Sequence, residues 1–200
     1  NNTNVIEANE VVNLVSNLVR SDPEKEIGVV CFNVPQQMLI LDLLETSFGE
    51  QQMTIPESLI VKNIENVQGD EKDVIIFSIG YAPDPKGKMH FQFGSLSMPG
   101  GENRLNVAIT RAREKIIVVT SILPEQLQVD DLKNEGPKLL KKYLQYTKTV
   151  ADGKFKPFIA QIRDTKTKWY LKDMVESWGN EKFPDKLFKK DELPFADVSA

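Results

Sequence analysis

The chain has 200 residues, of which 40% are hydrophobic and 27% are charged, and a formal net charge of −4. This composition suits one globular domain with a short appendage, and it lacks the basic footprint usual in nucleic-acid-binding domains without excluding such binding. The longest apolar runs fall far short of the roughly 18 residues that a membrane span requires, and no signal-peptide pattern opens the chain. We therefore expect a cytoplasmic protein without a membrane partner. Because the first residue is not Met, we also expect a fragment of something longer.

Helical and strand patterns alternate along the first 150 residues. The hydrophobic spacing predicts helices over 7–20, 36–48, part of 101–113 and 137–149, and strands over 27–32, 58–61, 74–79 and 115–120. A loop rich in Pro and Gly occupies 81–101, with room for a short strand at 90–93. Such alternation indicates an α/β fold, in which a parallel sheet is covered by helices on both faces.

The composition divides the chain into residues 1–150 and an extension, 151–200, that is rich in Lys, Asp and aromatic residues. Apolar positions from Trp169 to Trp178 have helical spacing, which favours packing against a neighbour over stacking on bases. The single histidine, His90, has no acidic, Ser or Cys partner at a telling spacing, and we expect it to be solvated or structural. The single cysteine, Cys31, lies in an apolar run, and we expect it to be a small buried hydrophobe.

The first candidate for function is the turn before the strand predicted at 74–79. Gly69 lets the backbone approach a ligand closely, while Gln68 and Glu71 offer an amide and a carboxylate to a sugar or to phosphate-bound water. On local chemistry alone, an ordinary turn with Glu71 in solvent explains the same residues.

The second candidate is the segment 101–113. Its apolar positions have helical spacing, and Arg104 and Arg111 are seven residues apart, so that a continuous helix would superimpose them on one side. Guanidinium groups beside a packed face suit a phosphoryl group in transfer. A solvated basic helix end is the alternative. We expect both segments to face one edge of the sheet, where ligands of α/β folds usually bind.

These two segments resemble motifs V and VI of superfamily 1 helicases, in the branch that contains the nonsense-mediated-decay RNA helicase and its bacterial relatives. The matching residues are Gln68, Gly69 and Glu71, followed by Arg104, Leu105, Asn106, Val107, Ala108, Thr110, Arg111 and Ala112. Residues 4–8 resemble the Asn-x-x-Glu-Ala that opens the second motor domain, and residues 27–36 resemble motif IV. The resemblance covers roughly residues 4–150 and implies a RecA-like second motor domain, of the P-loop NTPase type, that lacks the Walker A loop.

The resemblance also implies roles for residues at an ATP site. Arg111 would contact the γ-phosphate as the arginine finger, and Glu71 would contact the ribose. Gln68 and Gly69 would line the same cleft, with Gln68 coupling it to the nucleic acid. Arg104 would support the site, and it belongs with the other four to the implied nucleotide-binding set.

Two further residues are implied to face nucleic acid. Asn63 occupies the place of a small polar residue that contacts the nucleic-acid backbone in relatives, where Ser or Thr is more frequent. Gln36 is the glutamine of motif IV. Two positions depart from the family pattern: Glu65 stands where many relatives have Asp, and Gln37 stands where the decay helicase has a second phosphate-contacting Arg.

The sequence lacks the parts that hold ATP itself. Hydrolysis requires a phosphate-cradling loop with its lysine and a carboxylate that binds Mg²⁺. The nearest candidate, residues 80–89, has six residues between its glycines instead of four, and Met where Ser or Thr must bind the metal. We therefore predict no metal site in this chain. ATP and Mg²⁺ would be held mainly by a first, N-terminal RecA-like domain of the same parent protein, and the fragment alone would be inactive.

The sequence thus predicts the second motor domain of an ATP-dependent DNA or RNA helicase that acts on single-stranded nucleic acid. One rival is a non-catalytic nucleic-acid or protein interaction module derived from a helicase domain. Retention of Arg111 and Glu71 argues against it, because a decayed site loses costly desolvated charges. A second rival is another P-loop enzyme, such as a nucleotide kinase, which the missing phosphate loop disfavours.

Overall fold

The computed structural model describes residues 3–82 and 93–153 of the chain. Four parallel strands form one sheet in the order β2-β1-β3-β4. The strands are β1 (Ile27–Cys31), β2 (Ile60–Asn63), β3 (Lys72–Ser78) and β4 (Ala112–Val119). The α-helices are α1 (Val5–Ser21), α2 (Val34–Glu50), α3 (Gly101–Ile109) and α4 (Glu135–Ala151), and two short 3-10 helices are η1 (Gly94–Ser97) and η2 (Pro124–Gln126).

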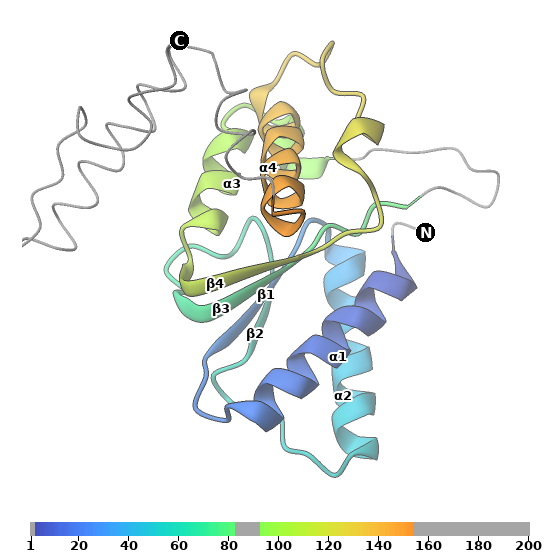
Figure 1. Ribbon diagram of the computed structural model, residues 1–200, viewed down its shortest axis with the longest axis vertical. Helices are drawn as coiled ribbons and strands as arrows, with labels where there is room; N and C mark the ends of the chain where they lie inside the picture. Colours follow the sequence, from blue (N-terminus) through green and yellow to red (C-terminus); the bar gives the residue numbers. More distant parts are fainter. Residues whose placement is uncertain (1–2, 83–92, 154–200) are drawn as a thin grey trace, which may run out of the picture. The chain divides into compact units, whose positions relative to one another are not determined.

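Helices cover both faces of the sheet, with α1 and α2 on one side and α3 and α4 on the other (Figure 1). Alternate residues of the central strands serve the two cores, because successive side chains of a strand point to opposite faces. In β3, Val74 and Ile76 pack with α1 and α2, whereas Ile75 and Phe77 pack with α3 and α4. The two-sided cover explains why β1 and β3 are continuous apolar runs in the sequence.

Local signals place the ends of the helices. Asn4 caps α1 by accepting a hydrogen bond from the backbone N–H of Glu7, and Asn33 caps α2 by accepting one from Gln36. Helix α3 begins after Gly100, whose φ of 77° lies in the left-handed region that favours glycine. These caps fix where α1, α2 and α3 meet the sheet.

The predicted order of strands and helices is confirmed, and the architecture is the expected α/β, RecA-like one. Most boundaries differ from the predicted ones by one or two residues. Strand β2 begins at Ile60 rather than at 58, and β4 begins at Ala112 rather than at 115. The helix predicted within 101–113 ends at Ile109, so that Arg111 lies outside it. Cys31 is buried as predicted, and burial raises the pKa of its thiol to about 12.

The chain divides into two units, Asn1–Leu144 and Gln145–Ala200. The predicted division after residue 150 stays a prediction. The strand expected at 90–93, His90 and the helix expected around 169–178 lie wholly or mostly outside the described residues. Within the described ranges, no helix is both long enough and apolar enough to cross a membrane.

Candidate nucleotide site

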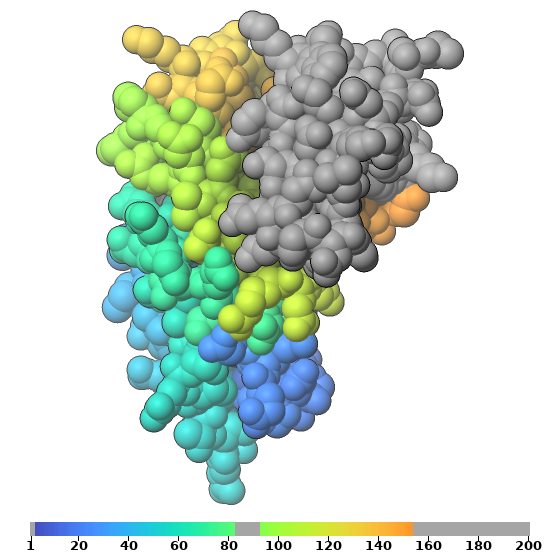
Figure 2. Space-filling model, turned by 90° about the vertical axis from the view of Figure 1, so that its left-hand side faces the viewer, coloured from blue at the N-terminus to red at the C-terminus, as the bar shows by residue number. Residues whose placement is uncertain are grey.

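Pairing of β3 with β4 brings the two candidate segments together. The backbone N–H of Lys72 donates to the carbonyl oxygen of Arg111 at 3.0 Å, and Lys72 lies opposite Ala112 in the ladder. Glu71 and Arg111, which precede these strands by one residue, are therefore neighbours. In the space-filling view, the segment that joins β2 to β3 (teal) lies at the surface beside α3 (green) (Figure 2).

Glu71 and Arg111 form a long ion pair, with 3.8 Å between Oε1 and Nη1. The Arg111 side chain is 20% exposed. Its Nε donates to the carbonyl oxygen of Val107 at 3.1 Å, and its Nη2 donates to the hydroxyl of Thr110 at 3.2 Å. The Glu71 side chain is 52% exposed. Ion pairs this exposed contribute only about 0–1 kcal/mol, so an incoming anion can displace the carboxylate at little cost. The guanidinium is thus held in place by a backbone carbonyl and a neighbouring hydroxyl while its charge stays available for a ligand.

The turn that carries Gln68 and Gly69 is open to a ligand. Gly69 has a φ of 87°, a conformation that favours glycine, and apart from its chain neighbours no residue comes within 4 Å of where a Cβ would stand. Gln68 is exposed. An ion pair of 2.5 Å joins Lys62, in the strand before the turn, to Asp70, which directly follows Gly69. The backbone around Gly69 is therefore both accessible and held.

The predicted location of this site requires a correction. Both segments do share one edge of the sheet, but they lie where β3 and β4 begin, whereas the edge where ligands of open α/β sheets usually bind carries the carboxyl ends of the strands. Arg104 and Arg111 are not superimposed on one helix, because α3 ends between them. Arg104 instead donates to the carbonyl oxygen of Ser95 in η1 at 3.3 Å. The error arose because a helical period alone cannot show where the helix stops.

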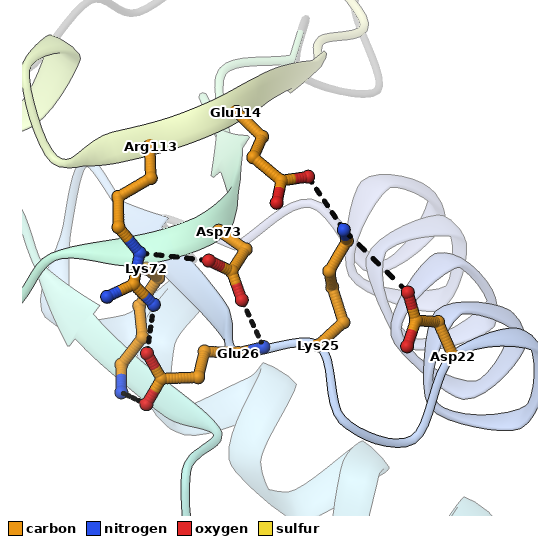
Figure 3. A network of polar contacts seen from close by, with 7 residues as sticks. All are labelled: Asp22, Lys25, Glu26, Lys72, Asp73, Arg113 and Glu114. Atoms are coloured by element: carbon orange, nitrogen blue, oxygen red, sulfur yellow. Dashed lines mark hydrogen bonds and ion pairs between the residues drawn. The ribbon is translucent and has the colours of Figure 1, made fainter.

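Next to Glu71 and Arg111, a network of charged side chains joins the starts of β1, β3 and β4 (Figure 3). Arg113 Nε donates to Asp73 at 2.9 Å, and Arg113 Nη2 also bonds Glu26. Glu26 in turn pairs with Lys72 at 3.4 Å. Lys25 extends the network, 2.6 Å from Glu114 and 3.7 Å from Asp22.

A β-bulge in β4 allows these contacts. Lys72 lies opposite Ala112 but Val74 lies opposite Lys115, so two residues of β4 face Asp73. The bond from Arg113 holds the pKa of the Glu26 carboxyl below its usual value, and the backbone N–H of Glu26 does the same for the pKa of Asp73. Arg113 is thereby drawn away from Glu71, which leaves Arg111 as the arginine that contacts Glu71.

The two residues predicted to face nucleic acid lie at the opposite edge, where the strands end. Asn63 is the last residue of β2 and is 5% exposed, and its Oδ1 accepts from the N–H of Glu65 at 3.0 Å. Gln36 is fully buried. Its Oε1 accepts from the backbone N–H of Asn4 at 2.7 Å, and its Nε2 donates to Ser78 Oγ at 3.1 Å. The structure thus gives Gln36 internal contacts at both ends of its amide and argues against the predicted contact with nucleic acid.

Sequence reasoning missed the part played by Glu7. Its carboxylate is 2% exposed and lies where β3 and β4 end, bonded at 2.7 Å each to the backbone N–H groups of Gly80 and Ser121. Burial raises the pKa of this carboxyl, and those two bonds oppose the rise. Glu7 is the Glu of the Asn-x-x-Glu-Ala match at residues 4–8, which is the signal in the sequence that singles it out. In the described ranges, no three His, Cys, Asp or Glu side chains converge as metal ligands.

Comparison with known proteins places this arrangement in a family. A family model described as an AAA domain matches residues 1–122. The chain is 39% identical over 184 residues to "Uncharacterized ATP-dependent helicase MG140" of Mycoplasma genitalium, which covers 86% of the chain and 16% of that protein. It is 31% identical to "DNA polymerase alpha-associated DNA helicase A" of Saccharomyces cerevisiae over 66% of the chain and 16% of that protein.

A further relative is "Regulator of nonsense transcripts 1" of Caenorhabditis elegans, which is 33% identical over 58% of the chain and 10% of that protein. The chain thus spans between a tenth and a sixth of the length of these three relatives. These matches agree with the resemblance found in motifs IV, V and VI. The chain belongs to the AAA domain family, in the superfamily 1 helicase branch that includes the regulator of nonsense transcripts.

Proposed function

We propose that this chain is the second motor domain of an ATP-dependent helicase and that it supplies Arg111 and Glu71 to ATP held by a first motor domain. The observation that carries the proposal is the contact between β3 and β4, which sets Glu71 and Arg111 side by side at one exposed edge. ATP and its Mg²⁺ would be bound mainly by the first domain, since this chain has no phosphate loop.

In this proposal, closure of the two domains brings the γ-phosphate to the guanidinium of Arg111. The phosphate oxygens replace the 3.8 Å contact with Glu71, which turns to the ribose. The hydrogen bonds from Arg111 to Val107 and Thr110 hold the guanidinium in place before ATP arrives. An arginine in this role contributes about 10³ to 10⁵ in rate. Gln68 and the open backbone at Gly69 complete the same side of the cleft, and Arg104 supports η1.

Single-stranded nucleic acid would lie across the other edge of the sheet, at Asn63. Asn63 is itself nearly buried, with its Oδ1 bonded to Glu65, so it marks the place of this contact at the end of β2. We leave Gln36 out because both ends of its fully buried amide are bonded internally. The names of the relatives include both a DNA helicase and a regulator of nonsense transcripts, so DNA and RNA are both candidate substrates. A cytoplasmic location stays a prediction.

The test is the ATPase rate of the full-length protein with single-stranded DNA and RNA in parallel. We expect Arg111→Ala to lower kcat by about 10³-fold while nucleic-acid binding is retained, because the arginine acts on the transition state. Arg20→Ala is the matched control, since Arg20 is exposed on α1 and bonds only Gln51 among the described residues. Equal rates for wild type and Arg111→Ala would refute the proposal, and the fragment alone should show no turnover.

A further inference from the structure

Four buried polar side chains form a network where the strands of the sheet end. They are Asn4 and Glu7 of the first turn of α1, Gln36 of α2 and Ser78 of β3, and each is at most 5% exposed. We name this set the carboxyl-edge network. Asn4 Nδ2 donates to Glu7 at 3.0 Å and to Ser121 Oγ at 2.8 Å, and Gln36 Nε2 donates to Ser78 and to the carbonyl oxygen of Asn4. Its members come from three elements and thereby join them.

Glu7 is the centre of the carboxyl-edge network. Each of its oxygens accepts a backbone N–H from a different strand end, Oε2 from Gly80 after β3 and Oε1 from Ser121 after β4. The hydroxyl of Ser78 adds a longer contact of 3.5 Å. In the part of the chain that the structure describes, all partners of this carboxylate are neutral. Burying the charge of the Glu7 carboxylate without a cationic partner is costly. Ordinary packing therefore does not explain why Glu occupies this position.

The chemistry explains why a carboxylate stands here. Two backbone donors from two strands require two acceptors on one side chain, and only Asp and Glu carry two acceptor oxygens. Gln would turn an NH₂ group toward one of the two N–H groups. Gly80 contributes to the fit: its φ is 76°, and an added Cβ would lie 3.2 Å from Asn33 Nδ2 and 3.4 Å from Gln36 Cγ. Glycine at position 80 thus allows the backbone conformation that points this N–H at Glu7.

The topology links this carboxylate to the other edge of the sheet. Strands β3 and β4 begin next to Glu71 and Arg111, and they end next to Gly80 and Ser121. At about 3.3 Å per residue, β3 spans roughly 23 Å between the two edges. Glu7 thus links α1 to the residues just beyond the far ends of the two strands whose near ends carry the proposed ATP residues.

We propose that Glu7 is a positioning residue that couples nucleic-acid binding at the carboxyl edge to ATP hydrolysis at the amino edge. It ties Gly80, just after β3, and Ser121, just after β4, to the first turn of α1, so that nucleic acid bound at this edge of the sheet shifts β3, β4 and α1 together. This inference rests on the proposed function. Without Glu7, Gly80 and Ser121 lose their link to α1 although the β3–β4 ladder remains, and nucleic acid no longer accelerates hydrolysis.

The test compares ATPase rates of the full-length protein with and without oligodeoxythymidine or oligouridine. For Glu7→Gln we expect the unstimulated rate and the KM for ATP to stay near wild type, while stimulation falls by about tenfold, a usual size for coupling between sites. Glu10→Gln is the matched control, because it makes the same change at an exposed position of the same helix. Normal stimulation of Glu7→Gln overturns the inference. So does an equal fall of both rates with a lower Tm, because Glu7 would then be merely structural.

Two further variants make the result decisive. If Glu7→Gln does not fold, Ser78→Ala replaces it, since it removes the hydroxyl that contacts both Glu7 and Gln36. A partial loss of stimulation at an unchanged basal rate supports the inference, and unchanged stimulation overturns it.

Arg111→Ala separates the two proposals. If it abolishes hydrolysis while Glu7→Gln behaves as wild type, only the coupling role fails, whereas full activity of Arg111→Ala removes the proposed function itself.

Discussion

Gly101 is the position where the structure allows a substitution to be predicted in most detail. It is the first residue of α3 and is buried against η1. A Cβ built there would lie 2.6 Å from the backbone carbon and 2.7 Å from the Cα of Leu96, and closer still to its carbonyl oxygen. Ordinary contacts of this kind begin near 3.4 Å, so Gly101→Ala requires backbone movement by about 1 Å.

The magnitude follows from two opposing effects. Overpacking of this kind costs typically about 1–3 kcal/mol and occasionally more. The gain in helix propensity from Gly to Ala is at most about 1 kcal/mol and offsets part of it. We expect a net loss of about 2 kcal/mol, since the atoms in the way belong to the backbone and no rotamer change relieves the contact. With a urea slope of about 2 kcal/mol per M, the midpoint of unfolding falls by about 1 M.

Gly49→Ala is the matched control, because Gly49 lies in α2 and, apart from its neighbours in the helix, no residue comes within 4 Å of where its Cβ would stand. The same substitution there should raise the urea midpoint slightly, through propensity alone. The assay is urea unfolding of the 200-residue chain followed by far-UV circular dichroism. A midpoint of Gly101→Ala equal to or above that of Gly49→Ala would disprove the packing of α3 on η1.

Two other predictions concern the ion network at the starts of the strands. Asp73→Asn removes one of the two carboxylate partners of Arg113 and leaves Glu26, so Arg113 can compete with Arg111 for Glu71. Because Glu71 is the residue proposed to bind the ribose, we expect a higher KM for ATP with little change in kcat, against unchanged kinetics for Asp22→Asn. Unchanged kinetics of Asp73→Asn would contradict this. The second concerns pH. Because the pKa values of Glu26 and Asp73 are lowered in the folded chain, their stabilising effect is complete above their ordinary values of 4.5 and 3.8 and is lost as the pH falls through the lowered ones. The urea midpoint of wild type should therefore fall more between about pH 6 and about pH 3 than that of a Glu26→Gln, Asp73→Asn double variant, and parallel curves would contradict the assignment.

Much of the fold could be predicted from the sequence because its signals are local. Apolar runs marked β1 and β3, and the spacing of Val11, Val12 and Val15 marked the buried face of α1. Helix ends were less certain. The motif VI helix stops at Ile109, where Thr110 begins the link to β4, and the helical period of the following residues gave no sign of this.

The sequence predicted which residues belong to the candidate site better than it predicted how they are arranged. The resemblance named Glu71 and Arg111, but their contact depends on the register between β3 and β4, which is a long-range property. The structure also separates Gln36 from the surface and gives Glu7 partners more than 70 residues away along the chain. Side chains whose partners are that distant have no local pattern by which the sequence could reveal them.

The central claim is that Arg111 reaches the transferring phosphoryl group of ATP. Its most direct test is a structure of the full-length protein with ADP, Mg²⁺ and aluminium fluoride, which stands in for the γ-phosphate in transfer. The account predicts the Arg111 guanidinium within about 3 Å of a fluoride, a hydrogen-bonding distance, with its contact to Glu71 broken. A closed site in which Arg111 remains paired with Glu71, while another residue contacts the fluoride, would contradict it.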